Sequence, residues 1–233
     1  AFALLALLPL VQFGQTIVST DPQNKNVVLE QFTGVNCGYC PQGSTISHSI
    51  YDANPTRVVL IAVHAGSFST PSTGQPDFRT PFGTALVNQS NNGGYYPTGT
   101  VNRQVFPGLE VASGGTAMFR DKWTNAAGQI LAQPSYVNVG ATAQIDLTTR
   151  LITVNVEAYY TEASPLSTNK INVVLLQDKT YGFQAGGNAG NNYEHNNRLV
   201  HMLTGQWGAE ITQTTKGSLY TNTFTYTIPD HYN

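Results

Sequence analysis

One segment, Val27-Val28-Leu29-Glu30-Gln31-Phe32-Thr33-Gly34-Val35-Asn36-Cys37-Gly38-Tyr39-Cys40-Pro41, holds both cysteines of this 233-residue chain. Its apolar beginning predicts a buried strand that Thr33-Gly34 ends, and Pro41 suits the first turn of a helix, where its missing N–H costs nothing. Two thiols separated by two residues close a disulfide only where the backbone turns tightly, as it does in that first turn. Free N–H groups of the turn favour the thiolate of the first cysteine. The segment therefore predicts a redox-active pair.

The residues around this segment predict a β-α-β unit. Ile46, Ile50 and Ala53 recur at helical spacing and predict a helix from Pro41 to Ala53. Residues 57–63 form an uninterrupted apolar run, typical of a strand in a parallel sheet. Further on, we expect a short helix at 82–88, a strand that begins at 95–101 and a longer helix at 117–131. Residues 27–133 are therefore predicted to form an α/β domain.

Beyond Pro134 the apolar pattern changes to a period of two. This alternation predicts strands at 136–143, 151–159, 171–176 and 219–228. Strands separated by turn signals favour an all-β sandwich of the immunoglobulin-like kind over residues 134–233. The predicted fold is thus an α/β domain followed by an all-β immunoglobulin-like sandwich.

Composition and the first residues indicate export. Only 10% of residues are charged, the formal net charge is −2, and there is no basic cluster, which excludes a nucleic-acid-binding protein. The apolar run of residues 1–11 is too short to span a bilayer but fits the core of a signal peptide, and Pro9 disfavours a buried helix there. We interpret residues 1–26 as a signal-peptide remnant, without its true N-terminus, and a linker. No transmembrane span is expected in the mature chain.

The order of these motifs resembles the thioredoxin superfamily. A predicted strand leads into Cys-Gly-Tyr-Cys-Pro, which is followed by a helix and a second strand. The sequence Tyr-Pro-Thr then precedes another strand. More narrowly, the chain resembles the outer membrane protein 28 family of Gram-negative bacteria in residues 30–34, 37–41, 96–103, 193–197 and 205–208. That resemblance implies a thioredoxin-like domain followed by a β-sandwich, with a further strand beyond Asn233. It also implies a location in the periplasm, in the outer membrane or at the cell surface.

The cysteine pair is the candidate catalytic site. In the redox interpretation Cys37 attacks as the thiolate and Cys40 resolves the mixed disulfide, so the disulfide itself takes the place of a cofactor. The alternative is a structural bridge, but so short a loop constrains the unfolded chain little. The intervening Gly38 and Tyr39 resemble the dipeptide of periplasmic disulfide isomerases and are assigned to substrate binding. A second cysteine pair is missing, so no metal site is expected.

The resemblance places Tyr96 and Pro97 beside the cysteine pair. In thioredoxin-like folds a cis-proline packs there, and the backbone of the residue before it pairs with a substrate strand. An ordinary trans bond is the commoner state of X-Pro peptides. We nevertheless predict a cis bond and assign both residues to substrate binding.

Proton transfer is where this chain departs from the thioredoxin pattern. Gln31 occupies the position of the buried carboxylate that accepts the proton of the second thiol. The neighbouring Glu30 points to the opposite face, because side chains alternate along a strand. His64, at the end of the second strand, lies near the cysteine-bearing edge of the sheet. Glu30 and His64 are therefore only candidate accessory residues.

Two functions remain open on the sequence alone. The first is a cell-envelope thiol-disulfide oxidoreductase or isomerase that acts on thiols and disulfides of exported proteins or peptides. The alternative is a non-catalytic outer-membrane or surface binding module on a thioredoxin-like scaffold, with an envelope protein as partner. No nucleic-acid partner is expected for either.

Overall fold

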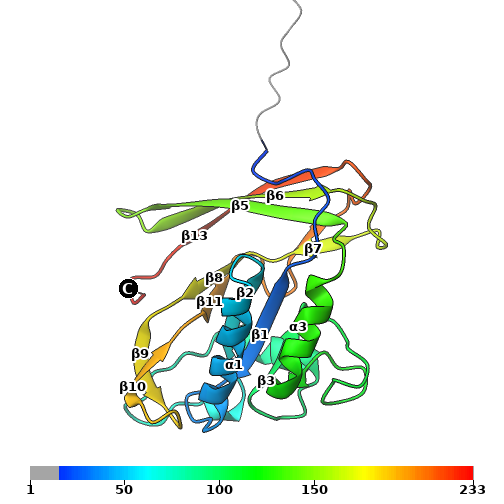
Figure 1. The fold of residues 1–233 in the computed structure, drawn as a ribbon. Helices are drawn as coiled ribbons and strands as arrows, with labels where there is room; N and C mark the ends of the chain where they lie inside the picture. Colours follow the sequence, from blue (N-terminus) through cyan, green and yellow to red (C-terminus); the bar gives the residue numbers. More distant parts are fainter. Residues whose placement is uncertain (1–15, 233) are drawn as a thin grey trace, which may run out of the picture.

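The structure is a computed structural model that describes residues 16–232. Residues 1–15, which carry most of the predicted signal-peptide remnant, lie outside the described residues. The described chain forms two layers: a mixed six-stranded sheet with helices packed on it, and a three-stranded antiparallel sheet that lies across one end of it (Figure 1). The cysteine segment belongs to the first layer.

The six-stranded sheet has the order β4-β3-β1-β2-β11-β8. Strand β1 is parallel to β2 and antiparallel to β3, which in turn is antiparallel to β4. The strands are β1 (Val27–Thr33), β2 (Val58–His64), β3 (Thr98–Val101), β4 (Met118–Phe119), β8 (Val174–Gln177) and β11 (Arg198–Met202). The helices are α1 (Cys40–Ala53), α2 (Gly83–Ser90) and α3 (Trp123–Leu131), with short 3-10 turns η1 (Ser67–Ser69) and η2 (Arg120–Lys122).

Apolar side chains on both faces of β1 anchor this layer. On one face Val27 and Leu29 pack with Ile50 of α1 and with Trp123 of α3, and all four are buried. On the other face Phe32 belongs to a second buried cluster that includes Leu86 of α2. Complete burial of such a side chain contributes roughly 1.5–3 kcal/mol. The two clusters bury apolar side chains on both faces of β1, and they fix the end of β1 from which the cysteine turn leaves.

The elements of the first part agree with the predicted order, with one difference. Helix α1 covers the predicted 41–53 helix, and α2 lies at the predicted short helix. The predicted helix at 117–131 begins only at Trp123. Residues 118 and 119 instead pair with β3 as β4, and the indole Nε1 of Trp123 donates a hydrogen bond to the carbonyl oxygen of Met118 at 3.2 Å.

Strands from the second part extend the sheet of the first, which differs from the predicted division at residues 133 and 134. Strand β11 lies beside β2, where the backbone N–H of Ala62 donates to the carbonyl oxygen of Asn197 at 2.7 Å, and β8 pairs with β11. The predicted strand at 171–176 corresponds to two strands in different sheets. Strand β7 (Asn169–Ile171) pairs with β12 (Ala209–Ile211), whereas β8 pairs with β11. An alternating pattern predicts a strand but does not specify which sheet it joins.

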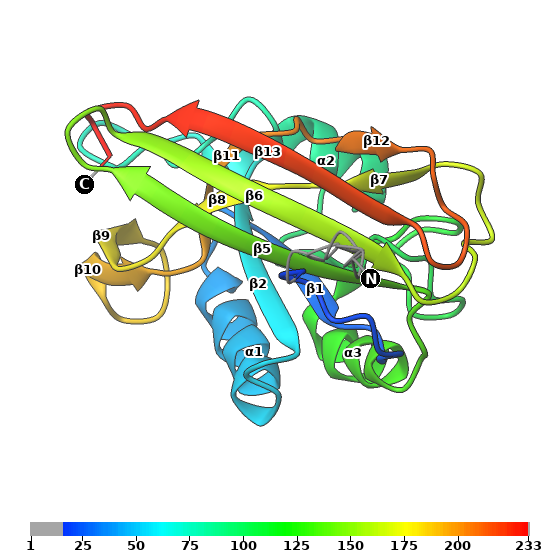
Figure 2. The same ribbon diagram turned by 90° about the horizontal axis from the view of Figure 1, so that it is seen from above.

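The second layer is the antiparallel sheet β13-β6-β5, whose long strands cross above β1 and β2 (Figure 2). Its strands are β5 (Val137–Asp146), β6 (Leu151–Tyr160) and β13 (Leu219–Thr227), close to the predicted positions. One face of β6 carries Val154, Val156, Ala158 and Tyr160, all buried. A separate hairpin of β9 (Thr180–Gln184) and β10 (Gly190–His195) lies on the side of α1 (Figure 1). The immunoglobulin-like arrangement stays a prediction.

Candidate functional site

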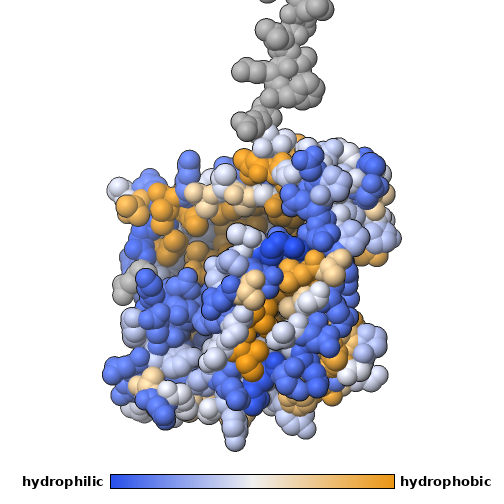
Figure 3. All heavy atoms as spheres, viewed as in Figure 1, coloured by the Kyte–Doolittle hydropathy of each residue, from blue (hydrophilic) through white to orange (hydrophobic). Residues whose placement is uncertain are grey.

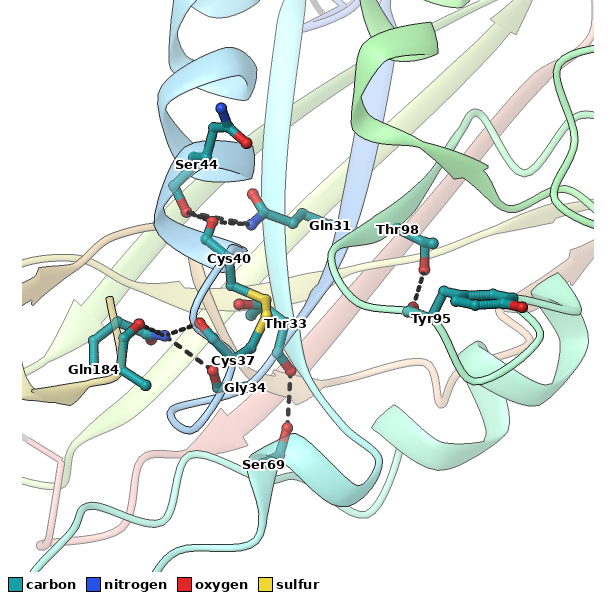
Figure 4. Close-up of a disulfide and its surroundings, with 12 residues drawn as sticks. Gln31, Thr33, Gly34, Cys37, Cys40, Ser44, Ser69, Tyr95, Thr98 and Gln184 are labelled. Carbon is teal, nitrogen blue, oxygen red and sulfur yellow. Dashed lines mark hydrogen bonds between the residues drawn. A yellow bond between two sulfur atoms is a disulfide. The ribbon is translucent and has the colours of Figure 1, made fainter. Parts of the chain in front are cut away.

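Cys37 and Cys40 form a disulfide where β1 leads into α1. A tight turn forms there because the N–H of Cys37 donates to the carbonyl oxygen of Gly34 at 3.0 Å and the N–H of Cys40 donates to that of Cys37 at 3.3 Å. Cys40 is the first residue of α1, and Pro41 follows it in the first turn. The predicted close pairing of the two sulfur atoms at the beginning of a helix is therefore confirmed (Figure 4).

The β9–β10 hairpin packs on the backbone of the cysteine turn. Nε2 of Gln184 donates hydrogen bonds to the carbonyl oxygens of Cys37 at 2.9 Å and Gly34 at 3.1 Å (Figure 4). The N–H of Ala185 donates to the carbonyl oxygen of Val35 at 2.7 Å. Both cysteines are buried, with exposed fractions of 2% for Cys37 and 1% for Cys40.

Gly186 permits this close approach. Its φ of +78° favours glycine, and a Cβ atom there would lie 2.1 Å from the carbonyl oxygen of Gly38. Residues 182–190 are typical of a flexible hairpin, and no local pattern in them specifies a contact with the cysteine turn. The glycine run was the one available signal, since glycines also occur where two backbones approach closely.

The 3-10 turn η1 holds the cysteine segment from another side. The hydroxyl of Ser69 donates to the carbonyl oxygen of Thr33 at 2.8 Å, and the N–H of Asn36 donates to that of Phe68 at 2.9 Å. Gly34 lies so close that a Cβ atom on it would be 2.4 Å from the carbonyl carbon of Phe68. The turn that carries the disulfide is thus fixed by backbone contacts on two sides.

Gln31 is buried beneath the pair and takes part in a neutral network. Its Nε2 donates to the carbonyl oxygen of Cys40 and to the hydroxyl of Ser44, both at 3.3 Å, while the hydroxyl of Ser47 donates to its Oε1 at 3.4 Å. An amide neither gains nor loses a proton in this range of pH. Gln31 therefore positions the first turn of α1 and is no proton acceptor.

Glu30 lies on the other face of β1, as the alternation predicted. Its carboxylate forms a bidentate ion pair with Arg103, with Oε1 2.6 Å from Nη2 and Oε2 2.7 Å from Nε. The Glu30 side chain is only 4% exposed, and the guanidinium of Arg103 neutralises its buried carboxylate. The structure does not bring Glu30 to the cysteine pair.

The Tyr96–Pro97 peptide bond is cis, as predicted. Pro97 packs on the first turns of α1, because a Cβ atom on Gly43 would lie 3.1 Å from its ring. The Tyr96 ring lies against Phe68, and burial raises the pKa of its hydroxyl. Tyr39, in contrast, is 70% exposed, with the guanidinium of Arg120 5.7 Å from its ring centroid.

His64 is buried at the end of β2, on a small cavity of about 30 Å³ that Cys40 and His195 also line. Neither ring nitrogen of His64 has a hydrogen-bond partner within residues 16–232. Burial first, and then the charges of His195 and Arg198, lower the pKa of His64 to about 3. Burial likewise lowers the pKa of His195 to about 4. Both imidazoles are therefore neutral at physiological pH.

Two further features concern metal ligands and membrane-spanning helices. In the part of the chain that the structure describes, no group of three or more acidic, cysteine or histidine side chains is arranged to hold a metal ion. Among the same residues no helix is long and apolar enough to cross a membrane.

Comparison with known proteins places this architecture in a family. The family model of outer membrane protein Omp28 matches residues 84–233. The chain belongs to the outer membrane protein Omp28 family. Membership of the Omp28 family confirms the predicted export to the cell envelope.

Solved structures show what fold this Omp28-family protein shares. HBP35 of Porphyromonas gingivalis has a TM-score of 0.68 at 20% identity, over 88% of this chain. The chain spans about 65% of the length of HBP35. A protein of Agrobacterium tumefaciens has a TM-score of 0.50 at 11% identity, over 87% of this chain and 79% of that chain. No curated protein matches the sequence.

Proposed function

We propose that this Omp28-family protein is a binding module of the cell envelope, built on a thioredoxin-like scaffold, whose disulfide stabilises the scaffold. The buried disulfide is the observation that carries this proposal. Thiol-disulfide exchange begins when a thiolate reaches one sulfur atom of the bond, and burial of both cysteines hinders that approach. The β9–β10 hairpin is hydrogen-bonded to the cysteine turn through Gln184 and Ala185 and holds it in this buried arrangement.

The arrangement of β1, α1, β2 and β3 supports the thioredoxin-like scaffold. A parallel strand pair flanks the cysteine turn, and the antiparallel β3 follows the cis-proline Pro97. The Cys37–Cys40 pair begins the helix between the two parallel strands. This is the order of elements that the resemblance to the superfamily implies.

The chemistry around the pair also favours binding over turnover. Exchange requires a group that accepts the proton of the second thiol, and the amide of Gln31 occupies that position. A second acceptor would be His64, but an imidazole whose pKa is lowered to about 3 binds a proton weakly. A disulfide so placed resists reduction and keeps the first turn of α1 attached to β1.

Oxidoreductase activity is the second candidate, because the pair lies at the first turn of α1, which also packs on Pro97. It requires a local opening that exposes a sulfur atom, since both cysteines are buried. The substrates would then be thiols or disulfides of exported proteins or peptides.

Exposure of the native protein to a glutathione redox buffer, followed by alkylation and mass spectrometry, separates the two candidates. The binding module predicts that the pair stays oxidised while the protein is folded and is reduced once it is unfolded in urea. Rapid reduction of the folded protein, together with catalysed reduction of a protein disulfide that Cys37→Ser abolishes, would overturn the proposal. The variant Ser49→Ala, which changes an exposed side chain of α1, is the control for the substitution itself.

A further inference from the structure

A cleft of about 650 Å³ separates the two sheets at the end of β1 opposite the disulfide. The molecule is hollowed beneath the upper sheet, and hydrophobic residues lie along the roof of the hollow (Figure 3). Small-molecule sites in proteins typically enclose about 300–1,000 Å³. The cleft has the size of a ligand site.

The walls of the cleft are apolar above and below. Its floor includes Val59 and Ile61 of β2, and its roof includes Val137 and Val139 of β5. Val59 is 45% exposed and Val139 is 60% exposed, so these facing side chains leave unfilled space between the sheets. Apolar side chains exposed on two facing walls indicate a surface that an apolar ligand would cover.

The polar part of the lining carries an excess of positive charge. Arg103 is neutralised by Glu30, but Lys25 and Lys170 also line the cleft. Nζ of Lys25 donates to the uncharged Oε1 of Gln133 at 2.9 Å. Nζ of Lys170 lies 3.7 Å from Oε1 of Glu210, and both of these side chains are at least half exposed. The lining itself therefore contains three cations and one carboxylate, in a chain whose formal net charge is −2.

We propose that the cleft binds a monomeric amphiphile with a single apolar chain and a carboxylate head group, as a fatty acid has. The apolar chain would lie between β2 and β5, and the carboxylate would lie by the lysines. The finite volume between two sheets favours one molecule over a membrane surface. This inference rests on the proposed binding function and names its ligand class.

Titration calorimetry with laurate below its micellar concentration tests the apolar walls. Val139→Asp places a charge in the roof and is expected to weaken laurate binding by at least about tenfold, which corresponds to about 1.4 kcal/mol. Thr142→Asp places the same charge on the outer face of β5, at an exposed position, and should leave the affinity unchanged. Equal affinity of the two variants, with circular dichroism showing both folded, would overturn the site. Val59→Asp repeats the test on the floor.

The charge of the head group is tested separately. Lys170→Gln should weaken laurate binding by about two- to fivefold, as expected for a partly exposed ion pair. Lys216→Gln, at an exposed lysine that does not line the cleft, should not change it. Dodecyltrimethylammonium has the same chain with a positive head and should bind more weakly than laurate. Equal binding of the two amphiphiles would contradict the proposal.

Two further arms separate this inference from the proposed function. Sedimentation with vesicles of anionic phospholipid, in the absence of laurate binding, would replace the monomeric ligand with a membrane surface and overturn the inference. A folded protein that binds no laurate but resists glutathione would lose the ligand class and keep the binding module. A folded protein that binds laurate and also catalyses thiol-disulfide exchange would support the ligand cleft and overturn the proposed function.

Discussion

Gln184 donates a hydrogen bond from its side-chain amide to the carbonyl oxygen of Cys37 at 2.9 Å, across 147 positions of sequence. This bond joins the β9–β10 hairpin, which is encoded late in the chain, to the cysteine turn encoded early. The same amide also reaches Gly34 and is buried at 3% exposure. The cysteine turn is therefore held in place by residues far from either cysteine in the sequence.

Gln184→Ala is expected to uncover the disulfide. The change removes donors from buried carbonyl oxygens, which costs about 1–3 kcal/mol. A hairpin that opens more readily by about 1.4 kcal/mol would let dithiothreitol reduce the folded protein about tenfold faster. The rate is measured by timed alkylation in the absence of denaturant. Gln89→Ala, at an exposed glutamine of α2, is the control and should leave the rate unchanged. An unchanged rate in Gln184→Ala would show that the hairpin does not limit access.

Glu30→Gln is expected to be strongly destabilising. It leaves the guanidinium of Arg103 beside a neutral amide in a mostly buried position, and loss of one partner of a buried pair costs about 3–5 kcal/mol. Asp77→Asn breaks an equally short pair with Arg79 in which both side chains are nearly half exposed, and it should cost no more than about 1 kcal/mol. Urea unfolding of the two variants measures the contrast. Similar losses in both would show that burial does not govern the Glu30 pair.

Asn102→Ala should destabilise the end of β3 more than Asn102→Gly does. The side chain of Asn102 accepts a bond from the N–H of Val28 at 2.8 Å and donates to the carbonyl oxygen of Asn26 at 2.9 Å, so both changes lose these bonds. Its φ of +52° is tolerated by glycine, whereas alanine adds about 1 kcal/mol of strain. Thermal unfolding should rank wild type above glycine above alanine. The reverse order of the two variants would contradict this account.

The buried histidines predict a loss of stability in mild acid. In the folded protein His64 has a pKa of about 3, below the ordinary value of 6.5, so the unfolded chain binds its proton first as the pH falls. The stability is fully present above about pH 6.5 and declines by about 1.4 kcal/mol per pH unit for this group as the pH falls towards 3. His195, with a pKa of about 4, acts in the same direction.

His64→Phe tests this dependence because it removes one titrating group from a site that already packs on the ring of Phe78. Urea unfolding at pH 7, 6 and 5 should give a smaller decline for the variant than for wild type. His231→Gln, at an exposed histidine near the C-terminus, is the control. An identical decline in wild type and in His64→Phe would show that burial of His64 is not the cause.

The cis bond before Pro97 was expected mainly from the resemblance to the thioredoxin superfamily, whereas local sequence signals predicted the cysteine turn and the helix that follows Pro41. Each of these two elements depends on residues within a few positions of one another, so the pattern contains the necessary information. The cover of the disulfide could not be predicted in this way. It depends on Gln184 and Gly186, whose contacts with the cysteine turn arise only when the second half of the chain packs on the first. The same reason explains the sheet, since nothing near Arg198 specifies a place beside β2 and nothing near Val174 specifies one beside β11.

The position of β11 beside β2 has a consequence for folding. A folding chain in which only residues up to Leu131 are structured carries β1, β2 and β3, but the outer edge of β2 still has unpaired N–H and carbonyl groups. Such an edge pairs readily with other chains. Because residues 198–202 supply its partner, this edge stays open until the second half of the chain packs on the first. A chain cut before Arg198 is therefore expected to aggregate through β2.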